Sequence, residues 1–217
     1  MPVTSNLKEA MESHGLYNSN YQIVSNVVDD IFFNTEFNES VIKRVIHVST
    51  FEDKSKNITG IIEVIKELSS SRQDFKMVFI GDGTDFERMK SLATEQGLEE
   101  RIEFTGLLEK EALVREYARA SFMLINSNYE NMPVVINEAM ACGLPVLSTN
   151  VGGISEHLDS SKGVLIQAND TLQLLEQFNW MLNHYSDYDK ASIREYAEAL
   201  FSSRAISRKL NNIYHSI

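Results

Sequence analysis

Three features are scarce in this 217-residue sequence, and each scarcity excludes something. The single cysteine, Cys142, rules out a disulfide within the chain and fits a reducing compartment. No apolar run approaches the roughly 20 residues that a membrane-spanning helix needs. The start, Met1-Pro2-Val3-Thr4, also lacks the basic and apolar regions of a signal peptide. We therefore expect a cytoplasmic protein.

Basic charge is also in short supply. Lysine and arginine number 20 against 31 aspartates and glutamates, and the formal net charge is −11. Binding a polyanion requires a basic face, so a nucleic-acid partner is not expected. The histidines, at positions 14, 47, 157, 184 and 215, do not have the spacing of metal ligands. We expect neither a metal site nor a bound cofactor.

What the chain does have is an alternation of short apolar runs with amphipathic stretches. Continuous apolar runs are typical of strands that are covered on both faces. Between them lie helices with start signals, including Asn57 as a cap and a capping box from Thr84 to Glu87. Six such units predict an α/β fold with a doubly wound, Rossmann-like parallel sheet. The expected strands are residues 45–48, 77–80, 102–104, 122–125, 146–148 and 164–166.

The most informative segment is residues 127–146, where seven residues separate two carboxylates, Glu130 and Glu138. Pro133 suits the first turn of a helix, and Asn131 is a candidate cap. Gly143 is expected just past the end of that helix. The free amides and the positive dipole end of the helix would then point at whatever Glu130 contacts. This arrangement suits a phosphate that carries a polyhydroxylated group.

This segment resembles the Glu-x7-Glu signature of family 4 retaining glycosyltransferases. That signature reads Ser-x-x-Glu-x-x-Pro-x4-Glu-Ala-x-Ala-x-Gly-x-Pro-Val, and the segment matches every fixed position. The resemblance implies the C-terminal, donor-binding half of a metal-independent GT-B enzyme that uses a UDP- or GDP-sugar. By resemblance, Glu130 holds hydroxyls of the donor sugar and Glu138 holds both ribose hydroxyls. The backbone that grips sugar and phosphate would be that of Asn131, Met132, Pro133 and Val134.

The resemblance also assigns residues in the loops after other strands. Lys56 matches a family lysine that stabilises the departing diphosphate, which needs fixed positive charge when no metal is present. Thr50 stands where the family has arginine, and Lys54 is a candidate to compensate. Gly81, Leu107 and Gly153 are expected near the diphosphate or ribose, the base and the phosphates, respectively. For Gly81 and Gly153 a plain tight turn is the alternative interpretation.

Three segments follow from the resemblance. Residues 1–40, with a short strand at 21–24, would be a remnant of an N-terminal domain with its linker, 41–200 the nucleotide-sugar-binding domain, and 201–217 a C-terminal crossover helix. Past residue 188 we expect two helices with a break near residues 201–203. The acceptor-binding domain would then be missing, the chain alone inactive, and an apolar surface exposed around Phe32 and Phe33. The full-length enzyme would be a hexosyltransferase of polysaccharide biosynthesis that acts on a glycan or lipid-linked acceptor. It could associate peripherally with the cytoplasmic face of a membrane.

Two other classes of protein remain as alternatives. A non-catalytic module that holds a nucleotide or a partner protein is favoured by Thr50 in place of arginine. An NAD-dependent oxidoreductase is disfavoured, because the chain has no Gly-x-Gly-x-x-Gly fingerprint after a strand.

Overall fold

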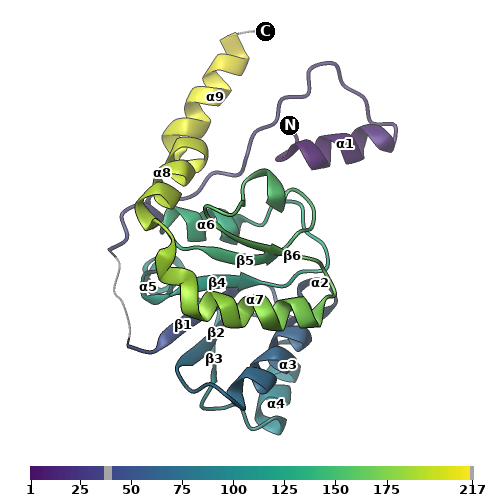
Figure 1. Cartoon of the computed structure of the whole chain (residues 1–217). Coiled ribbons are helices and arrows are strands. Elements are labelled where there is room, and N and C mark those ends of the chain that lie inside the picture. Colours follow the sequence, from purple (N-terminus) through teal and green to yellow (C-terminus); the bar gives the residue numbers. More distant parts are fainter. Residues whose placement is uncertain (37–40, 216–217) are drawn as a thin grey trace.

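Six parallel strands form one twisted sheet in the order β3-β2-β1-β4-β5-β6 (Figure 1). The computed structural model describes residues 1–36 and 41–215. Every strand expected for the sheet is present, so the doubly wound, Rossmann-like sheet is confirmed. The strands are β1 (Lys43–Val48), β2 (Phe75–Ile80), β3 (Ile102–Gly106), β4 (Phe122–Ile125), β5 (Val146–Thr149) and β6 (Gly163–Ile166).

Helices cover both faces of this sheet and create two hydrophobic cores. Neighbouring residues of a strand point to opposite faces, so Ile46 joins one core and Val45 the other. Helices α5 (Lys110–Arg119), α6 (Val134–Ala141) and α8 (Lys190–Phe201) pack on the Ile46 side. Helices α3 (Ile58–Ser69), α4 (Phe86–Glu95) and α7 (Thr171–His184) pack on the Val45 side. Burial on both faces explains the continuous apolar runs of the sequence.

The remaining elements are short or lie outside the two cores. Helix α2 (Asp53–Lys56) follows β1, and single 3-10 turns occur at η1 (Asp30–Phe32), η2 (Ile154–Glu156) and η3 (Tyr185–Asp187). Helices α1 (Ser5–Ser13) and α9 (Ser203–His215) extend away from the sheet (Figure 1). Among the described residues, no helix combines the length and the apolar character needed to cross a bilayer.

The order of the strands places a topological switch between β1 and β4. These two strands are neighbours although two other strands separate them in the chain. In open α/β sheets, ligands bind in the crevice at the carboxyl ends of the strands where the order reverses. The loops that follow β1 and β4 are therefore the ones that can form a site together.

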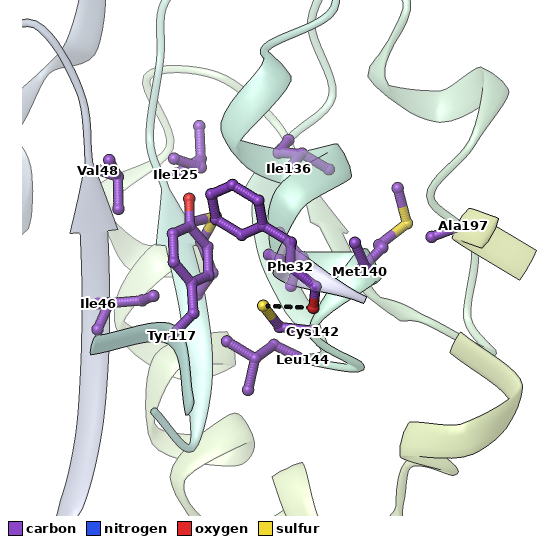
Figure 2. Packing of buried hydrophobic residues seen from close by; sticks show 14 of the residues in the cluster. Phe32, Ile46, Val48, Tyr117, Ile125, Ile136, Met140, Cys142, Leu144 and Ala197 are labelled. Atoms are coloured by element: carbon purple, nitrogen blue, oxygen red, sulfur yellow. Dashed lines mark hydrogen bonds between the residues drawn. The ribbon is translucent and has the colours of Figure 1, made fainter. Parts of the chain in front are cut away.

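The linker before β1 is anchored to the sheet domain rather than exposed. Phe32 is 5% exposed and packs edge-on against Tyr117 with ring centroids 5.4 Å apart (Figure 2). Its carbonyl accepts a hydrogen bond from the thiol of Cys142, with 3.4 Å between Sγ and O. The amide of Val28 donates to the carbonyl of Phe201 at 2.9 Å. The expectation of an exposed apolar surface at Phe32 is thus wrong, because α5 and α6 supply a pocket for its ring.

Three local predictions are corrected by the structure. Residues 21–24, expected as a short strand, form no strand in the described chain. The amide of Val24 instead donates a hydrogen bond to the carbonyl of Pro2. Thr84 does not cap α4, since its hydroxyl donates to the carbonyl of Phe51 at 3.5 Å. Asn57 does precede α3 but has a left-handed backbone, and Asp53 accepts the amide of Thr59 in its place.

The end of the first expected segment, residues 37–40, and the end of the last one, residues 216–217, lie outside the described residues. Within the described part, the predicted break between two C-terminal helices is confirmed, with α8 ending at Phe201 and α9 beginning at Ser203.

Candidate functional site

The loops after β1 and β4 enclose a cavity of about 180 Å³ at the topological switch. Backbone and side-chain bonds join the two loops. The amide of Asn128 donates to the carbonyl of Ser55, and its side-chain amide donates to the carbonyl of Lys54, both at 2.8 Å. The cavity is lined by Val48, Ser49, Thr50, Lys56, Ile125, Ser127, Glu130, Pro133, Val134 and Val135.

An ion pair lies at the centre of this lining. Lys56 Nζ is 2.5 Å from Glu130 Oε1, and the hydroxyl of Ser127 donates to the same oxygen at 2.8 Å. The side chains of Lys56 and Glu130 are 18% and 12% exposed, so water screens the pair only in part. Lys56 ends α2, and the left-handed backbone of Asn57 then turns the chain into α3. The structure therefore brings the two expected catalytic residues into direct contact.

Helix α6 presents its N-terminus to the same cavity. The helix begins at Val134, with Pro133 as the residue before it, and no side chain among the described residues caps it. The sequence expectation that Asn131 caps this helix is therefore wrong; Asn131 is exposed, and its carbonyl accepts the amide of Gly153 at 2.7 Å. Met132 is 4% exposed and packs into the core, so only its backbone can serve a ligand. The first amides of α6 remain available as anion donors.

Glu138 lies one turn further along α6 than the cavity-lining Val134. Its Oε2 accepts a hydrogen bond from the hydroxyl of Tyr117 at 2.9 Å. Burial raises the pKa of Glu138 above its ordinary value, and the bond from Tyr117 opposes this rise. The carboxylate is thus held in a fixed direction by a residue of α5.

The other expected site residues are distributed around this centre. Thr50 lines the cavity and is exposed, while Leu107 is 68% exposed in the loop after β3. A Cβ added to Gly81 would lie 1.9 Å from the carbonyl oxygen of Ser49, so this glycine permits close backbone packing. A Cβ on Gly153 would lie 2.4 Å from Cγ2 of Thr4. The loop of Gly153 is therefore in contact with the N-terminal segment.

Among the described residues, no cation other than Lys56 lines the cavity in place of the arginine that the resemblance implies. Lys54 is exposed. Arg88 forms ion pairs with Asp53 at 2.9 Å and with Asp85 at 3.0 Å. Lys56 is thus the lysine that the described residues place on the cavity.

Metal-ligating side chains do not cluster in the described residues. No group of three or more histidines, cysteines, aspartates or glutamates there is placed to hold an ion. An Asp-x-Asp sequence at 187–189 lies between α7 and α8, where both carboxylates have structural partners. Asp187 contacts Nδ1 of His184 at 2.9 Å, and Asp189 accepts the amides of Ala191 and Ser192 at the start of α8.

Comparison with known proteins identifies the family. Residues 29–199 match the family model described as glycosyl transferases group 1. The chain belongs to this family. The match includes both glutamates of the motif, the Lys56 loop and the whole sheet.

Among the proteins similar to this chain, one is a synthase by name and another a galactosyltransferase. N-acetyl-alpha-D-glucosaminyl L-malate synthase of Bacillus anthracis is 28% identical over 95% of this chain and 57% of its own length. Lipopolysaccharide 1,6-galactosyltransferase of Escherichia coli is 24% identical over 96% of this chain and 62% of its own. The solved structure of Anabaena Alr3699/HepE in complex with UDP-glucose matches the fold with a TM-score of 0.83 and 18% identity, covering all of this chain and 63% of that one. The chain thus spans about six-tenths of the length of these relatives.

Sequence reasoning on the family motif missed His47 and Ser49. His47 is fully buried in β1, with Nδ1 2.9 Å from the carbonyl oxygen of Leu124 and Nε2 2.8 Å from the hydroxyl of Ser49. Burial lowers the pKa of His47 to about 4, although the bond to Leu124 opposes this. The ring is therefore neutral at pH 7: Nδ1 donates a hydrogen bond to the carbonyl of Leu124, and Nε2 accepts one from the hydroxyl of Ser49. A histidine within the apolar run Val45–Val48 was the available signal.

Proposed function

We propose that this chain binds the donor for a retaining, metal-independent glycosyltransferase that uses a UDP- or GDP-sugar. The observation that carries the proposal is the Lys56–Glu130–Ser127 cluster at the uncapped start of α6. Family membership supports the class of reaction, and the fold shared with a protein solved with UDP-glucose supports the class of ligand. The retaining outcome rests on the resemblance of the Glu130–Glu138 motif.

The proposed roles follow from charge and position. The amides at the start of α6 would bind the diphosphate, since a helix N-terminus favours anions. Lys56 would stabilise the negative charge that develops on the leaving diphosphate. A bound phosphate would compete with Glu130 for Lys56, because Lys56 Nζ lies 2.5 Å from Glu130 Oε1. Glu130 would then be free to accept hydroxyls of the sugar.

Glu138 is proposed to hold the ribose. Its carboxylate has one oxygen on Tyr117, which leaves the other to accept ribose hydroxyls. We propose Thr50, Gly81, Leu107 and Gly153 as further backbone or side-chain contacts of the donor. The acceptor, a glycan or lipid-linked sugar, would bind to the part of the relatives that this chain does not cover.

A non-catalytic nucleotide-binding module is the second candidate. The observation that favours it is Thr50 on the cavity where the resemblance implies arginine, together with Arg88 held in ion pairs elsewhere. Such a module would bind nucleotides but lack a second cation for the departing diphosphate.

A thermal-shift panel of UDP, GDP, ADP and NAD tests the proposal. A ligand present at about 100 times its dissociation constant stabilises the folded state by about 2.7 kcal/mol. We expect UDP or GDP to raise the melting temperature, NAD to leave it unchanged, and Lys56→Ala to reduce the rise. A shift with NAD alone, or no difference between wild type and Lys56→Ala, would contradict the proposal. An assay of nucleotide-sugar hydrolysis separates the two candidates. An enzyme would hydrolyse the nucleotide sugar at a rate that saturates as its concentration rises, whereas a binding module would not hydrolyse it.

A further inference from the structure

The loop after β5 connects the N-terminal helix to the candidate site through Glu156. The carboxylate of Glu156 accepts the backbone amides of Ser5 at 2.9 Å and of Asn6 at 2.8 Å. These are the first amides of α1, which have no partner within their own helix. The next amide, that of Leu7, donates to the hydroxyl of Thr4 at 3.1 Å. A residue 150 positions away in sequence thus caps α1 jointly with Thr4.

This contact, which we call the Glu156 clasp (Glu156 with the amides of Ser5 and Asn6), is a main attachment of α1. None of the described residues of α1, 5–13, is buried, so the helix itself has no hydrophobic anchor. Thr4, just before it, is fully buried and lies on Gly153, where a Cβ would be 2.4 Å from Cγ2 of Thr4. Figure 1 shows α1 standing off the sheet beyond this point.

The opposite side of the same loop contacts the loop of Glu130. The amide of Gly153 donates to the carbonyl of Asn131 at 2.7 Å. A Cβ on Gly152 would lie 1.9 Å from the carbonyl oxygen of Glu130 and 2.8 Å from that of Asn131. Gly152 has a φ of +58°, so its backbone conformation also disfavours a side chain. Residues 152–153 are therefore enclosed between Thr4 and the backbone that carries Glu130.

We infer that Glu156 is a positioning residue that couples the placement of α1 to Glu130. The inference rests on the proposed function of Glu130 as the residue that holds the donor sugar. When the clasp forms, α1 and Thr4 press the glycine loop against Glu130 and Asn131, and the carboxylate keeps its direction toward Lys56. When the clasp is broken, the glycine loop and the backbone of Glu130 that it contacts become more mobile. Glu138 keeps its hydrogen bond from Tyr117.

Coupling of this kind is reciprocal. If α1 stabilises the arrangement that binds the sugar, then the bound sugar stabilises the attachment of α1 by the same factor. A purely structural cap on α1 would change the exchange of its amides but not the discrimination between a nucleotide and a nucleotide sugar. The two possibilities are therefore separable in one set of variants.

The test compares the 217-residue wild type with Glu156→Ala, Glu156→Gln and the control Glu99→Ala. Glu99 is exposed in the loop after α4. Hydrogen exchange without ligand reports the clasp, and calorimetry with UDP and UDP-glucose reports the coupling. In Glu156→Ala we expect roughly tenfold faster exchange at residues 5–7, because two charge-assisted bonds are lost. We also expect roughly threefold to tenfold weaker binding of UDP-glucose with unchanged binding of UDP.

Glu156→Gln, which keeps one acceptor oxygen, should fall between wild type and Glu156→Ala in both measurements. UDP-glucose should slow exchange at residues 5–7 in the wild type and not in Glu156→Ala. The clasp is refuted if exchange at residues 5–7 is the same in all four proteins. The coupling is refuted if wild type and Glu156→Ala prefer UDP-glucose over UDP equally. If the wild type binds neither ligand, GDP and GDP-mannose take their place. Binding of none of the four refutes the proposed function and the coupling with it, while the exchange data still decide the clasp.

Discussion

Glu130 and Glu138 belong to one motif but have different partners, and this difference predicts different roles. Glu130 pairs with a cation in the loop after β1, whereas Glu138 is held by the hydroxyl of Tyr117. Glu130 therefore lies beside a cation, whereas Glu138 lies in a fixed, partly desolvated position. Substitutions at the two positions should have separate effects on nucleotide and sugar.

Glu138→Ala should weaken the binding of UDP and of UDP-glucose, whereas Glu130→Ala should weaken only the binding of UDP-glucose. Losing an acceptor for buried hydroxyls costs on the order of 1–3 kcal/mol, or roughly fivefold to 150-fold in affinity. Calorimetry of both variants against both ligands measures this. Glu63→Ala, at an exposed position of α3, is the matched control and should bind as the wild type does. Equal losses of UDP affinity in both variants would contradict the assignment of roles.

Tyr117→Phe should shift the pH dependence of nucleotide binding. Burial raises the pKa of Glu138, and the hydrogen bond from Tyr117 lowers it, so removing the hydroxyl should raise that pKa further. Ribose hydroxyls need the ionised carboxylate, so binding should be lost at a higher pH as the solution is acidified. At pH 7 we expect a loss of roughly twofold to tenfold, the value of one ordinary hydrogen bond.

The pH profile of UDP affinity measures this shift. Tyr214→Phe is the control, since Tyr214 is 66% exposed on α9. An acid limb that stays at the wild-type pH would show that Tyr117 does not set the ionisation of Glu138.

Contacts between residues of different helices and strands were the part of the site that could not be predicted from the sequence. The family pattern placed Lys56 and Glu130 at one site, and the structure brings them into contact. The bond between Tyr117 and Glu138 depends on how α5 lies against α6, which no local pattern encodes. His47 and Ser49 are close in sequence, but a polar pair at the end of a strand becomes informative only when the burial of the histidine ring is known.

At the scale of elements, α6 contains a buried polar side chain that destabilises the folded state. Asn137 lies in the middle of this helix, is fully buried, and has no hydrogen-bond partner for either atom of its amide among the described residues. A buried, unsatisfied amide destabilises the folded state by about 1–3 kcal/mol. The helix that presents the candidate site is therefore less stable than its apolar packing alone would make it.

Asn137→Leu should increase the free energy of unfolding by about 1–3 kcal/mol, because it removes the unsatisfied amide and keeps a similar volume. Urea denaturation measures the change. Asn211→Leu, at an exposed position of α9, should change it by less than about 0.5 kcal/mol. A loss of stability in Asn137→Leu would mean that the amide has a partner in solution.

The linker is a second element whose stability can be tested. Phe32, from η1, fills a pocket between α5 and α6 (Figure 2). Phe32→Ala should lower the free energy of unfolding by about 3–5 kcal/mol, since it leaves a cavity against Tyr117. Phe33→Ala, at a half-buried neighbour, should cost clearly less. Equal effects of the two substitutions in urea denaturation would contradict the anchoring role of Phe32.

Strands were easier to predict than caps, for a physical reason. Burial on both faces makes each strand a continuous apolar run, so all six were visible in the sequence. Their polar ends were not, because Lys43 and Arg44 extend β1 only through pairing with β2. Asn57 does stand directly before α3, but its side chain makes no capping bond. The capping partner was misassigned because Asp53 accepts the amide of Thr59, six residues later, a separation larger than that of the usual capping pattern.

At the scale of the whole molecule, the sheet order determines where chemistry can occur. The switch between β1 and β4 brings Lys56 and Glu130 together, and α6 adds its amides from the same side. The segment before β1, α1 and α9 are attached around the sheet rather than built into it (Figure 1). The candidate site can therefore be examined in this chain.

The most direct test of the central claim is calorimetric titration of the 217-residue chain with UDP-glucose and GDP-mannose in the presence of EDTA. We predict saturable binding of at least one nucleotide sugar, with an affinity that EDTA does not change and that Glu138→Ala weakens by roughly fivefold or more. The reason is that, in the proposed site, helix amides and Lys56 rather than an ion would hold the diphosphate. Binding that requires added Mg²⁺ or Mn²⁺, or binding that Glu138→Ala leaves intact, would contradict the account.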